Sequence, residues 1–139
     1  MPSISQQVRE AIITEVKKVA NIGAVSSDWE HWNQETRFPA AFVILDSDVS
    51  ERLPTRSKEV SASFLVACIL QSEKPQDDFD TLRAGIENQI EDDPALGGLV
   101  IDAWVSGVSS FSTSKTVAGQ VYIRDVLVNV IYRHARGAA

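Results

Sequence analysis

The segment VSASFLVACIL, residues 60–70, contains the pattern that decides the fold. Apolar side chains recur at every second position, which is the spacing of one face of a β-strand: Val60, Ala62, Phe64, Val66, Cys68 and Leu70. The opposite face begins with Ser61 and Ser63 and continues with Leu65, Ala67 and Ile69. Because the second half of this strand is apolar on both sides, we expect another element of the chain or another subunit to cover its second face.

Three further strands are predicted around this one. The first is AAFVILD, residues 40–46, which starts after Pro39 and is joined to the strand EVSASFLVACILQS, residues 59–72, by the polar connection SDVSERLPTRSK. The other two are LVIDAWVSGVSSF, residues 99–111, and TVAGQVYIRDVLVNVIYRHA, residues 116–135. Their β-branched and aromatic content and their alternation favour strands. Residues 24–38 lack clear periodicity and are predicted to form a long loop.

Two helices are predicted. Residues 3–23 begin with Ser3 and Gln6 at the spacing of a capping box and end at Gly23, which can supply a left-handed stop. Residues 73–93 place four apolar side chains on one helix face, with Asp77 and Asp78 near the positive end of the helix dipole: Phe79, Leu82, Ile86 and Ile90. The Asp93-Pro94 step ends this helix, and the pair 97–98 of glycines allows a tight turn into the next strand.

The order of these elements is helix, two strands, helix, two strands. We therefore expect an α+β fold in which two main helices pack on a mostly antiparallel four-stranded sheet. A length of 139 residues with 44% hydrophobic composition predicts a single domain, residues 1–139. No apolar run reaches the roughly 18 residues that span a bilayer, and the start of the chain lacks the layout of a secretory signal, so we expect a cytoplasmic place of synthesis and no membrane contact.

Charge is concentrated in one segment. The chain carries a net charge of -6 at pH 7, and residues 73–93 hold eight carboxylates against Lys74 and Arg83. The rest of the chain is balanced, so the sequence offers no basic field of the kind that binds phosphates. We therefore do not expect nucleic acid to be a direct ligand.

The acidic helix has two interpretations. Its charges can form a solvated outer face, or they can dock on a basic patch of a neighbour. Bases for such a patch occur in the connection between the first two strands and, as Arg124, Arg133 and Arg136, near the end of the chain. If a neighbouring copy supplies them, the contact is head-to-tail, the kind that closes rings. The residues predicted for this contact are Arg52, Arg56, Lys58, Asp78, Asp80, Glu87, Glu91, Arg133 and Arg136.

Signatures of catalysis are missing from the sequence. It has no phosphate-binding glycine loop, G-x-S-x-G or H-E-x-x-H motif, or paired cysteines. Cys68, the single cysteine, is expected to be a small buried hydrophobe. Asp102 and Asp125 lie inside predicted strands and could form a carboxylate pair for acid–base work, but solvated or interface positions are more common for such residues. We predict no catalytic residue and no cofactor.

The loop SDWEHWNQE, residues 27–35, contains candidate metal ligands. Asp28, Glu30 and His31 are too close along one loop to surround an ion without help. The flanking Trp29 and Trp32 indicate an aromatic anchor instead. We predict no metal site.

The whole pattern resembles a family of bacteriophage proteins. The strand opening FPAAFVILDSD, the long strand VSASFLVACIL, the acidic segment IEDDPALGGLVIDAWVSGV and the final strand GQVYIRDVLVNVIYRHA occur in the order found in tail terminator proteins of long-tailed phages. This family includes the lambda minor tail protein U and related tail-completion proteins. The resemblance covers about residues 3–136, and its most distinctive local pattern is an acidic helix followed by DPALGGL and a strand.

The resemblance implies a structural virion protein without enzymatic activity. Such proteins have an α+β fold, form a six-membered ring on the last ring of the tail tube, stop tube growth, and present the surface to which the DNA-filled head or its connector attaches. The implied partners are further copies of the chain, the tail tube protein and a head–tail connector or neck protein. DNA would pass through the lumen without specific binding. The implied location is the tail or neck of the virion, after assembly in the host cytoplasm.

Three other functions fit the sequence. One is a different phage neck component, such as a head-completion or stopper protein, which would also be a small ring-former. A second is a small cytoplasmic α+β enzyme or ligand-binding domain with its site between sheet and helices, which predicts a buried polar cluster or a perturbed carboxylate. The third is an interaction module of a secretion or contractile apparatus.

Overall fold

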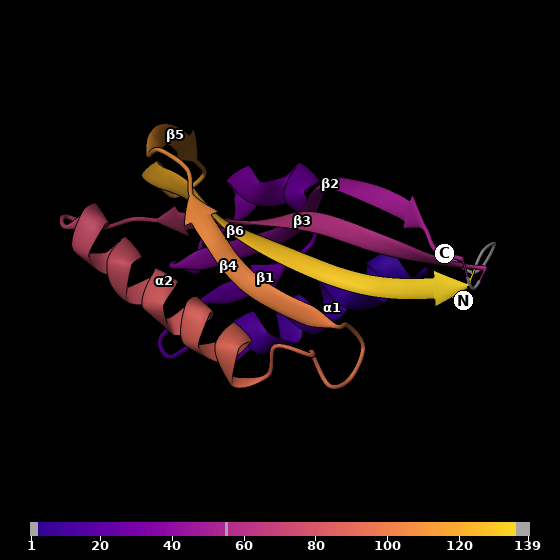
Figure 1. Cartoon of the computed structure of the whole chain (residues 1–139). Coiled ribbons are helices and arrows are strands. Elements are labelled where there is room, and N and C mark those ends of the chain that lie inside the picture. Colours follow the sequence, from indigo (N-terminus) through magenta and orange to yellow (C-terminus); the bar gives the residue numbers. More distant parts are fainter. Residues whose placement is uncertain (1–2, 55, 136–139) are drawn as a thin grey trace.

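The computed structural model describes residues 3–54 and 56–135 (Figure 1). These residues form two α-helices, a short 3-10 helix and six strands, in the order α1 (Ile4–Lys17), β1 (Ala24–Ser26), η1 (Trp29–Gln34), β2 (Ala40–Arg52), β3 (Ser57–Leu70), α2 (Pro75–Asp92), β4 (Asp102–Val108), β5 (Ser112–Thr116) and β6 (Gly119–Ala135). The predicted α+β class is confirmed.

The strands form one mixed sheet in the order β1-β2-β3-β6-β4, with β5 paired to β6. β1 runs parallel to β2, and the other neighbouring strands are antiparallel. The sequence predicted four strands where the sheet has six. β5 was not predicted: it lies just before the predicted final strand, and a tight turn joins it to β6, where Gly119 has a φ of 111°. β1 was also missed, because it is only three residues long, which is too short to show a period.

The β2–β3 hairpin is longer than expected. β2 continues to Arg52 through residues predicted to be a polar connection, so only residues 53–56 join the two strands. Polar strand residues cannot be distinguished from a loop by hydrophobic alternation, but here they pair with β3 from Ser47 opposite Ser63 to Arg52 opposite Lys58. We call residues 45–63 and 129–135, the distal parts of β2, β3 and β6, the arm.

Helix α1 begins as predicted. The Ser3 hydroxyl accepts a hydrogen bond from the Gln6 backbone N–H at 3.1 Å, and the Gln6 side chain accepts one from the Ser3 N–H at 2.7 Å. The end differs from the prediction: the left-handed residue is Asn21, with a φ of 66°, and not Gly23. Asparagine tolerates this conformation almost as glycine does. A β-carbon on Gly23 would lie 2.8 Å from the carbonyl carbon and oxygen of Arg37, so this glycine permits close backbone approach.

Helix α2 and the turn after it agree with the sequence. Its buried side chains are the four predicted ones, and Asp77 and Asp78 occupy its first turn. The helix ends before Asp93, whose carboxylate accepts a hydrogen bond from the Gly97 N–H at 2.8 Å. Gly97 and Gly98 have φ values of 72° and 88°.

Both α-helices cover one face of the sheet, which we call the inner face (Figure 1). The main core lies between them and the even-numbered residues of β3 and β6, with Phe64, Phe79 and Ile86 fully buried. Cys68 is buried in this core, as predicted, and burial raises the pKa of its thiol. The opposite, outer face of the sheet is covered only in part.

Candidate interaction surfaces

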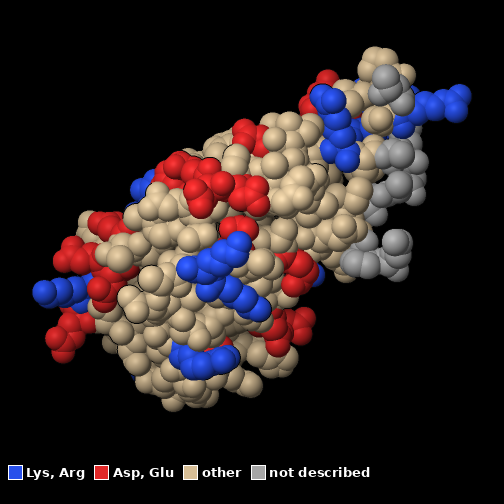
Figure 2. Space-filling model, turned by 90° about the horizontal axis from the view of Figure 1, so that it is seen from below, with Lys and Arg blue, Asp and Glu red and all other residues tan. Residues whose placement is uncertain are grey.

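The predicted basic residues gather at the tip of the arm. Arg52 pairs across the hairpin with Lys58, and Arg56 lies in the turn between them with a φ of 60°. Arg133 of β6 lies opposite Glu59 and forms an ion pair with it, with 3.2 Å between Nε and Oε1. The sheet therefore brings Arg52, Arg56, Lys58 and Arg133 together, and Figure 2 shows blue side chains at this narrow end. Arg136 lies outside the described residues.

The predicted acidic residues all lie on α2 but not on one stripe. Asp80, Glu87 and Glu91 follow a spacing of seven and four residues and face away from the core. Arg83 Nε lies 3.6 Å from Glu87 Oε2, and this ion pair neutralises part of the negative charge on that side of the helix. Asp78 lies on the other flank of the helix, where its carboxylate accepts a hydrogen bond from the Ser72 hydroxyl. We call Asp80, Glu87 and Glu91 the acidic stripe.

The arm tip and the start of α2 lie at different ends of the molecule, and α2 runs back from there toward the arm (Figure 1). β3 starts at the tip and runs 14 residues before the chain enters α2, and a strand of that length spans roughly 45 Å. In Figure 2 red side chains spread over the broad end, mixed with a few blue ones. Among the ion pairs of the described residues, none joins the tip to α2. Neither charged surface neutralises the other within one chain.

Arg124 does not belong to the basic surface, contrary to the prediction. Its guanidinium lies 4.7 Å from the ring centres of both Phe79 and Phe111, and its Nε donates a hydrogen bond to the Ser109 carbonyl at 2.6 Å. Charge alone suggested a surface base, but the alternation of β6 directs this side chain to the inner face, where two aromatic rings stabilise it.

The aromatic anchor predicted around Trp29 and Trp32 is confirmed. Their rings stack with 5.5 Å between centroids, and Trp29 contacts the Phe42 ring edge-on at 5.6 Å. With Phe38 they cover a small second core on the outer face, formed by Ala40, Phe42, Ala67, Ile69 and Val121. An element of the same chain therefore covers the apolar second face of β3.

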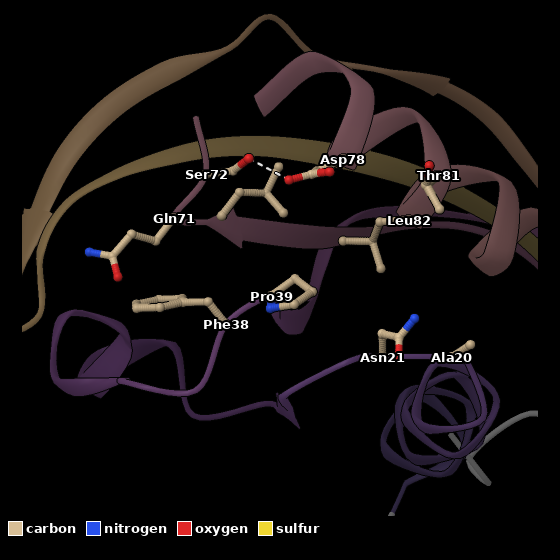
Figure 3. A pocket seen from close by; sticks show the side chains of 10 residues that line it. Ala20, Asn21, Phe38, Pro39, Gln71, Ser72, Asp78, Thr81 and Leu82 are labelled. Atoms are coloured by element: carbon tan, nitrogen blue, oxygen red, sulfur yellow. Dashed lines mark hydrogen bonds between the residues drawn. The ribbon is translucent and has the colours of Figure 1, made fainter. Parts of the chain in front are cut away.

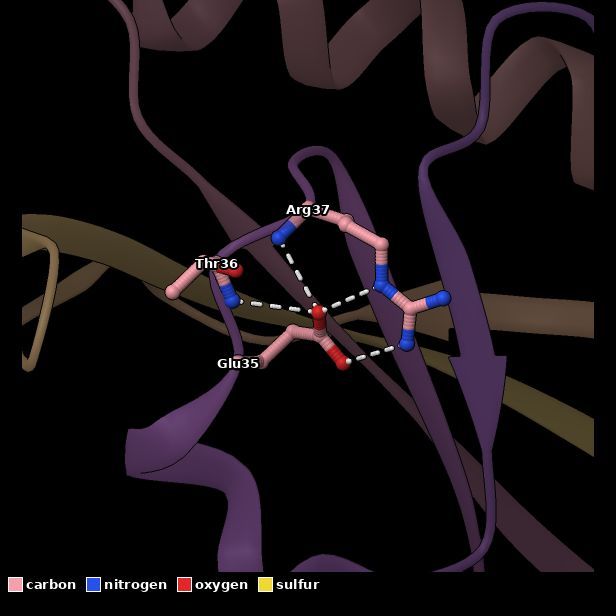
Figure 4. A network of polar contacts seen from close by, with 3 residues as sticks. All are labelled: Glu35, Thr36 and Arg37. Carbon is pink, nitrogen blue, oxygen red and sulfur yellow. Dashed lines mark hydrogen bonds and ion pairs between the residues drawn. The ribbon is translucent and has the colours of Figure 1, made fainter.

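A polar network holds the segment that follows this anchor. The Glu35 carboxylate accepts hydrogen bonds from the backbone N–H groups of Thr36 and Arg37, at 3.1 and 3.0 Å, and from the Arg37 guanidinium (Figure 4). The bond from the Arg37 side chain is the main reason that the pKa of Glu35 is lowered. These contacts lie within residues 35–37 and fix the local conformation of the loop that leads from η1 to β2.

The outer face of the arm has no such cover among the described residues. A shallow hollow of about 210 Å³ lies on it, lined by the hydroxyls of Ser47, Ser61 and Ser63 and by Trp104, Asn129 and Ile131. Trp104 is 37% exposed and Val49 71% exposed. Neither residue was predicted from the sequence to lie on a surface of interest. The exposure of Trp104 could have been predicted from strand alternation, because residues 102, 104 and 106 share one face and Asp102 and Ser106 are polar.

Asp102 and Asp125 do not form a carboxylate pair. Asp102 pairs with Ile131 at one end of β4, whereas Asp125 lies beyond the other end, where its N–H donates to the Ser109 hydroxyl at 2.8 Å. The pKa of Asp125 is raised, first by partial burial and second by the charge of Asp46. Asp125 is therefore a perturbed carboxylate whose acidic neighbour is Asp46 and not Asp102.

Two of the three residues considered as metal ligands, Asp28 and His31, form a pair. His31 Nδ1 lies 2.9 Å from an Asp28 carboxylate oxygen, and this hydrogen bond is the main reason that the pKa of His31 is raised. Within residues 3–54 and 56–135, no group of three or more His, Cys, Asp and Glu side chains could hold an ion.

A pocket of about 240 Å³ opens where α1, the start of β2, the end of β3 and α2 meet (Figure 3). Phe38, Pro39 and Leu82 supply apolar walls, and Asp78 with Ser72 forms a polar group on one side.

No helix in the described part of the chain is both long and apolar enough to cross a membrane.

Comparisons with known proteins find likeness in structure but not in sequence. No protein-family model matches the chain, and no curated protein sequence matches it. Among solved structures, the chain is similar to one from the "Virion of native gene transfer agent (GTA) particle", with a TM-score of 0.33 and 12% identity over 93% of this chain and 91% of that one. At this TM-score the likeness carries no argument about function.

Proposed function

We propose that this chain is a structural virion protein that forms a ring on the end of a phage tail tube. In this role it stops tube polymerisation and offers the surface to which the head attaches. The ring, of six copies by the family resemblance, would bind the tail tube protein on one side and a connector or neck protein on the other. The chain would have no enzymatic activity, and DNA would cross the lumen without specific binding.

The separation of charge carries this proposal. Within the described residues, no ion pair joins the basic arm tip to the acidic stripe of the same chain. The two surfaces can pair between copies, where the tip of one copy meets the carboxyl end of α2 in the next. Such a contact uses two different surfaces, and heterologous contacts close into rings when the rotation between copies permits. The same charges steer association and favour one orientation of the copies.

Termination follows from the geometry of a closed ring. Each tube ring offers a growing edge to the next ring, and a ring of different subunits that lacks this edge stops growth. The balanced charge of the remaining surface fits passage of DNA, since each fixed phosphate contact would retard transit.

Deletion of the gene tests the proposal. Phage lacking the chain should form tails that exceed the normal length, because tube subunits continue to add. Complementation with the intact chain should restore normal length. Tails of normal length in the deletion strain would contradict the terminator role and would favour a head-completion or stopper protein.

A ligand-binding domain is the second candidate, and the pocket beside Asp78 is the observation that favours it. Its volume of about 240 Å³ lies below the roughly 300–1,000 Å³ of most small-molecule sites. A saturable thermal shift with a small molecule would support this function. Substitution of Thr81 by Leu, which fills the pocket mouth from an exposed position, should abolish such a shift.

A further inference from the structure

Both edges of the sheet are open over long stretches. β1 pairs with only three residues of β2, positions 40–42, so residues 43–52 of β2 have no partner strand on that side within the described chain. At the other edge, β4 pairs with β6 alone. An open edge presents backbone N–H and C=O groups that can pair with a strand of another chain.

The open edge of β2 carries charged side chains and one bulge, but it is long, exposed and without proline. The charged residues along it are Asp46, Asp48, Glu51 and Arg52. Residues 45–52 are exposed in succession, on both faces of the strand, and Val49 is 71% exposed. Natural edges are usually short, covered, or interrupted by proline or a bulge. β2 has one bulge, between Leu45 and Ser47. The six residues 47–52 beyond it follow without interruption and contain no proline.

The ends of the two open edges that lie toward the arm tip differ in charge, although β2 also carries Asp46, Asp48 and Glu51 along its length. β2 ends at Arg52, with Arg56 and Lys58 directly beyond it. β4 begins at Asp102, and the chain reaches it from the carboxyl end of α2, where Glu91 and Asp92 are exposed. α2 also packs against β4. A β2 strand placed beside β4 of another copy would therefore bring bases toward carboxylates.

Strand direction fits the same arrangement. β2 and β6 run toward the arm tip, and β4 runs away from it, because each of the pairs β2–β3, β3–β6 and β6–β4 is antiparallel. Copies that share one orientation in a ring thus present antiparallel edges to each other. Arg52 then lies at the end of β4 that carries Asp102. That carboxylate accepts a hydrogen bond from the Ala103 N–H at 2.9 Å, so it must turn outward to meet an arginine.

We propose that copies of this chain join edge to edge, with the open edge of β2 paired antiparallel to the open edge of β4 in the next copy. This inference rests on the proposed function, in which the chain forms a homo-oligomeric ring, and it names the surfaces that make the junction. The sheet continues across each junction, and the arm tip contacts the carboxylates around the start of β4.

A lysine on the β2 edge tests the junction by light scattering over a concentration series. Val49→Lys places a charge on the β2 edge, and Val117→Lys is the matched control, because Val117 is 70% exposed in the β5–β6 turn. Wild type and Val117→Lys should assemble alike. Val49→Lys should raise the concentration of half-assembly at least about tenfold. Assembly of Val49→Lys at wild-type concentrations overturns the inference, as does a wild type that stays monomeric throughout.

Mixing two edge variants tests the heterologous pairing itself. Ser106→Lys alters the β4 edge at an exposed residue. Val49→Lys and Ser106→Lys should each stay monomeric, and their mixture should stop at a one-to-one dimer, since one intact β2 edge meets one intact β4 edge. A mixture that stays monomeric overturns the pairing.

Hydrogen exchange gives a readout without substitution. Amides in residues 47–52 and 102–108 should become protected when the wild type assembles, and unchanged exchange in an assembled sample overturns the edge junction. Tail length in the deletion strain tests the terminator role separately. Failure of the junction with overlong tails would leave the proposed function standing, and normal tails with protected edges would leave the junction standing.

Discussion

The outer face of the sheet has two halves built from the same strands. Far from the arm tip, where the start of β2 pairs with the end of β3, the tryptophans of η1 cover buried side chains of both strands. These are Phe42, Ala67 and Ile69. On the arm, the same face carries Ser61, Ser63 and Ser47 around an open hollow. One half is completed by its own chain, and the other is left open.

This difference separates two uses of a strand. The covered half adds buried apolar area and so stabilises the monomer. The arm adds little to that stability through its outer face, but it leaves free backbone edges and charged side chains available for contacts with another copy. Substitutions should accordingly affect folding in the covered half and assembly on the arm.

The largest effect is expected from shortening a side chain under the cover. Ile69→Ala removes a fully buried side chain and should lower the free energy of unfolding by about 2–5 kcal/mol. Leu65→Ala is the control on the same strand and face, at the border of the arm, where the side chain is only partly buried. It should cost about 1 kcal/mol. Denaturant unfolding of both variants measures the contrast, and equal losses would remove the distinction between the halves.

A smaller effect is expected where the covering loop meets the end of α1. Gly23→Ala would place a β-carbon 2.8 Å from the Arg37 backbone, and such overpacking should cost about 1–3 kcal/mol. Gly107→Ala is the matched variant, because a β-carbon there meets nothing within 4 Å. Its thermal midpoint should stay near that of the wild type. A Gly23→Ala protein as stable as Gly107→Ala would show that the loop yields without cost.

The smallest effect is expected at the boundary between the halves. Asp125 has a raised pKa in the fold, because burial and the charge of Asp46 disfavour its ionised form. The stabilising effect of its proton is therefore fully present below the pKa of the unfolded carboxyl and is lost as the pH rises through the folded pKa. Asp125→Asn should be more stable than the wild type at neutral pH, with the difference vanishing in acid.

Asp102→Asn makes the same change of group at an exposed position of β4 and is the comparison variant. Unfolding of both variants from pH 3 to pH 8 measures the difference. A gain for Asp125→Asn that persists at the acidic end would contradict an electrostatic origin.

The predictions from sequence succeeded where a short segment contained its own signal. The two-residue period of residues 60–70 identified β3, because successive side chains of a strand point to opposite faces whatever surrounds them. Ser3 with Gln6 identified the start of α1, since both hydrogen bonds of a capping box are local. The stripe of α2 and its end before Asp93 followed from helix geometry and the proline after it.

Candidate interface residues were only partly predictable. Charge singled out Arg52, Lys58 and Arg133, and the hairpin and β6 brought them to one tip. The same criterion included Arg124, whose strand position turns it inward onto aromatic rings. Charge records what a side chain can bind, and only its place on a strand or helix decides whether it is exposed.

By itself, the sequence determined the local elements, the apolar second face of β3 and the concentration of acid on α2, because each depends on residues a few positions apart. Only the tertiary structure decided that η1 covers that face, that β3 pairs with β6, and that Arg52, Lys58 and Arg133 meet at one tip. These features depend on contacts between distant segments, where backbone pairing and the packing of η1 on the sheet outweigh local preference. The open edges of β2 and β4 belong to the same class, since an edge exists only once the order of the strands is set.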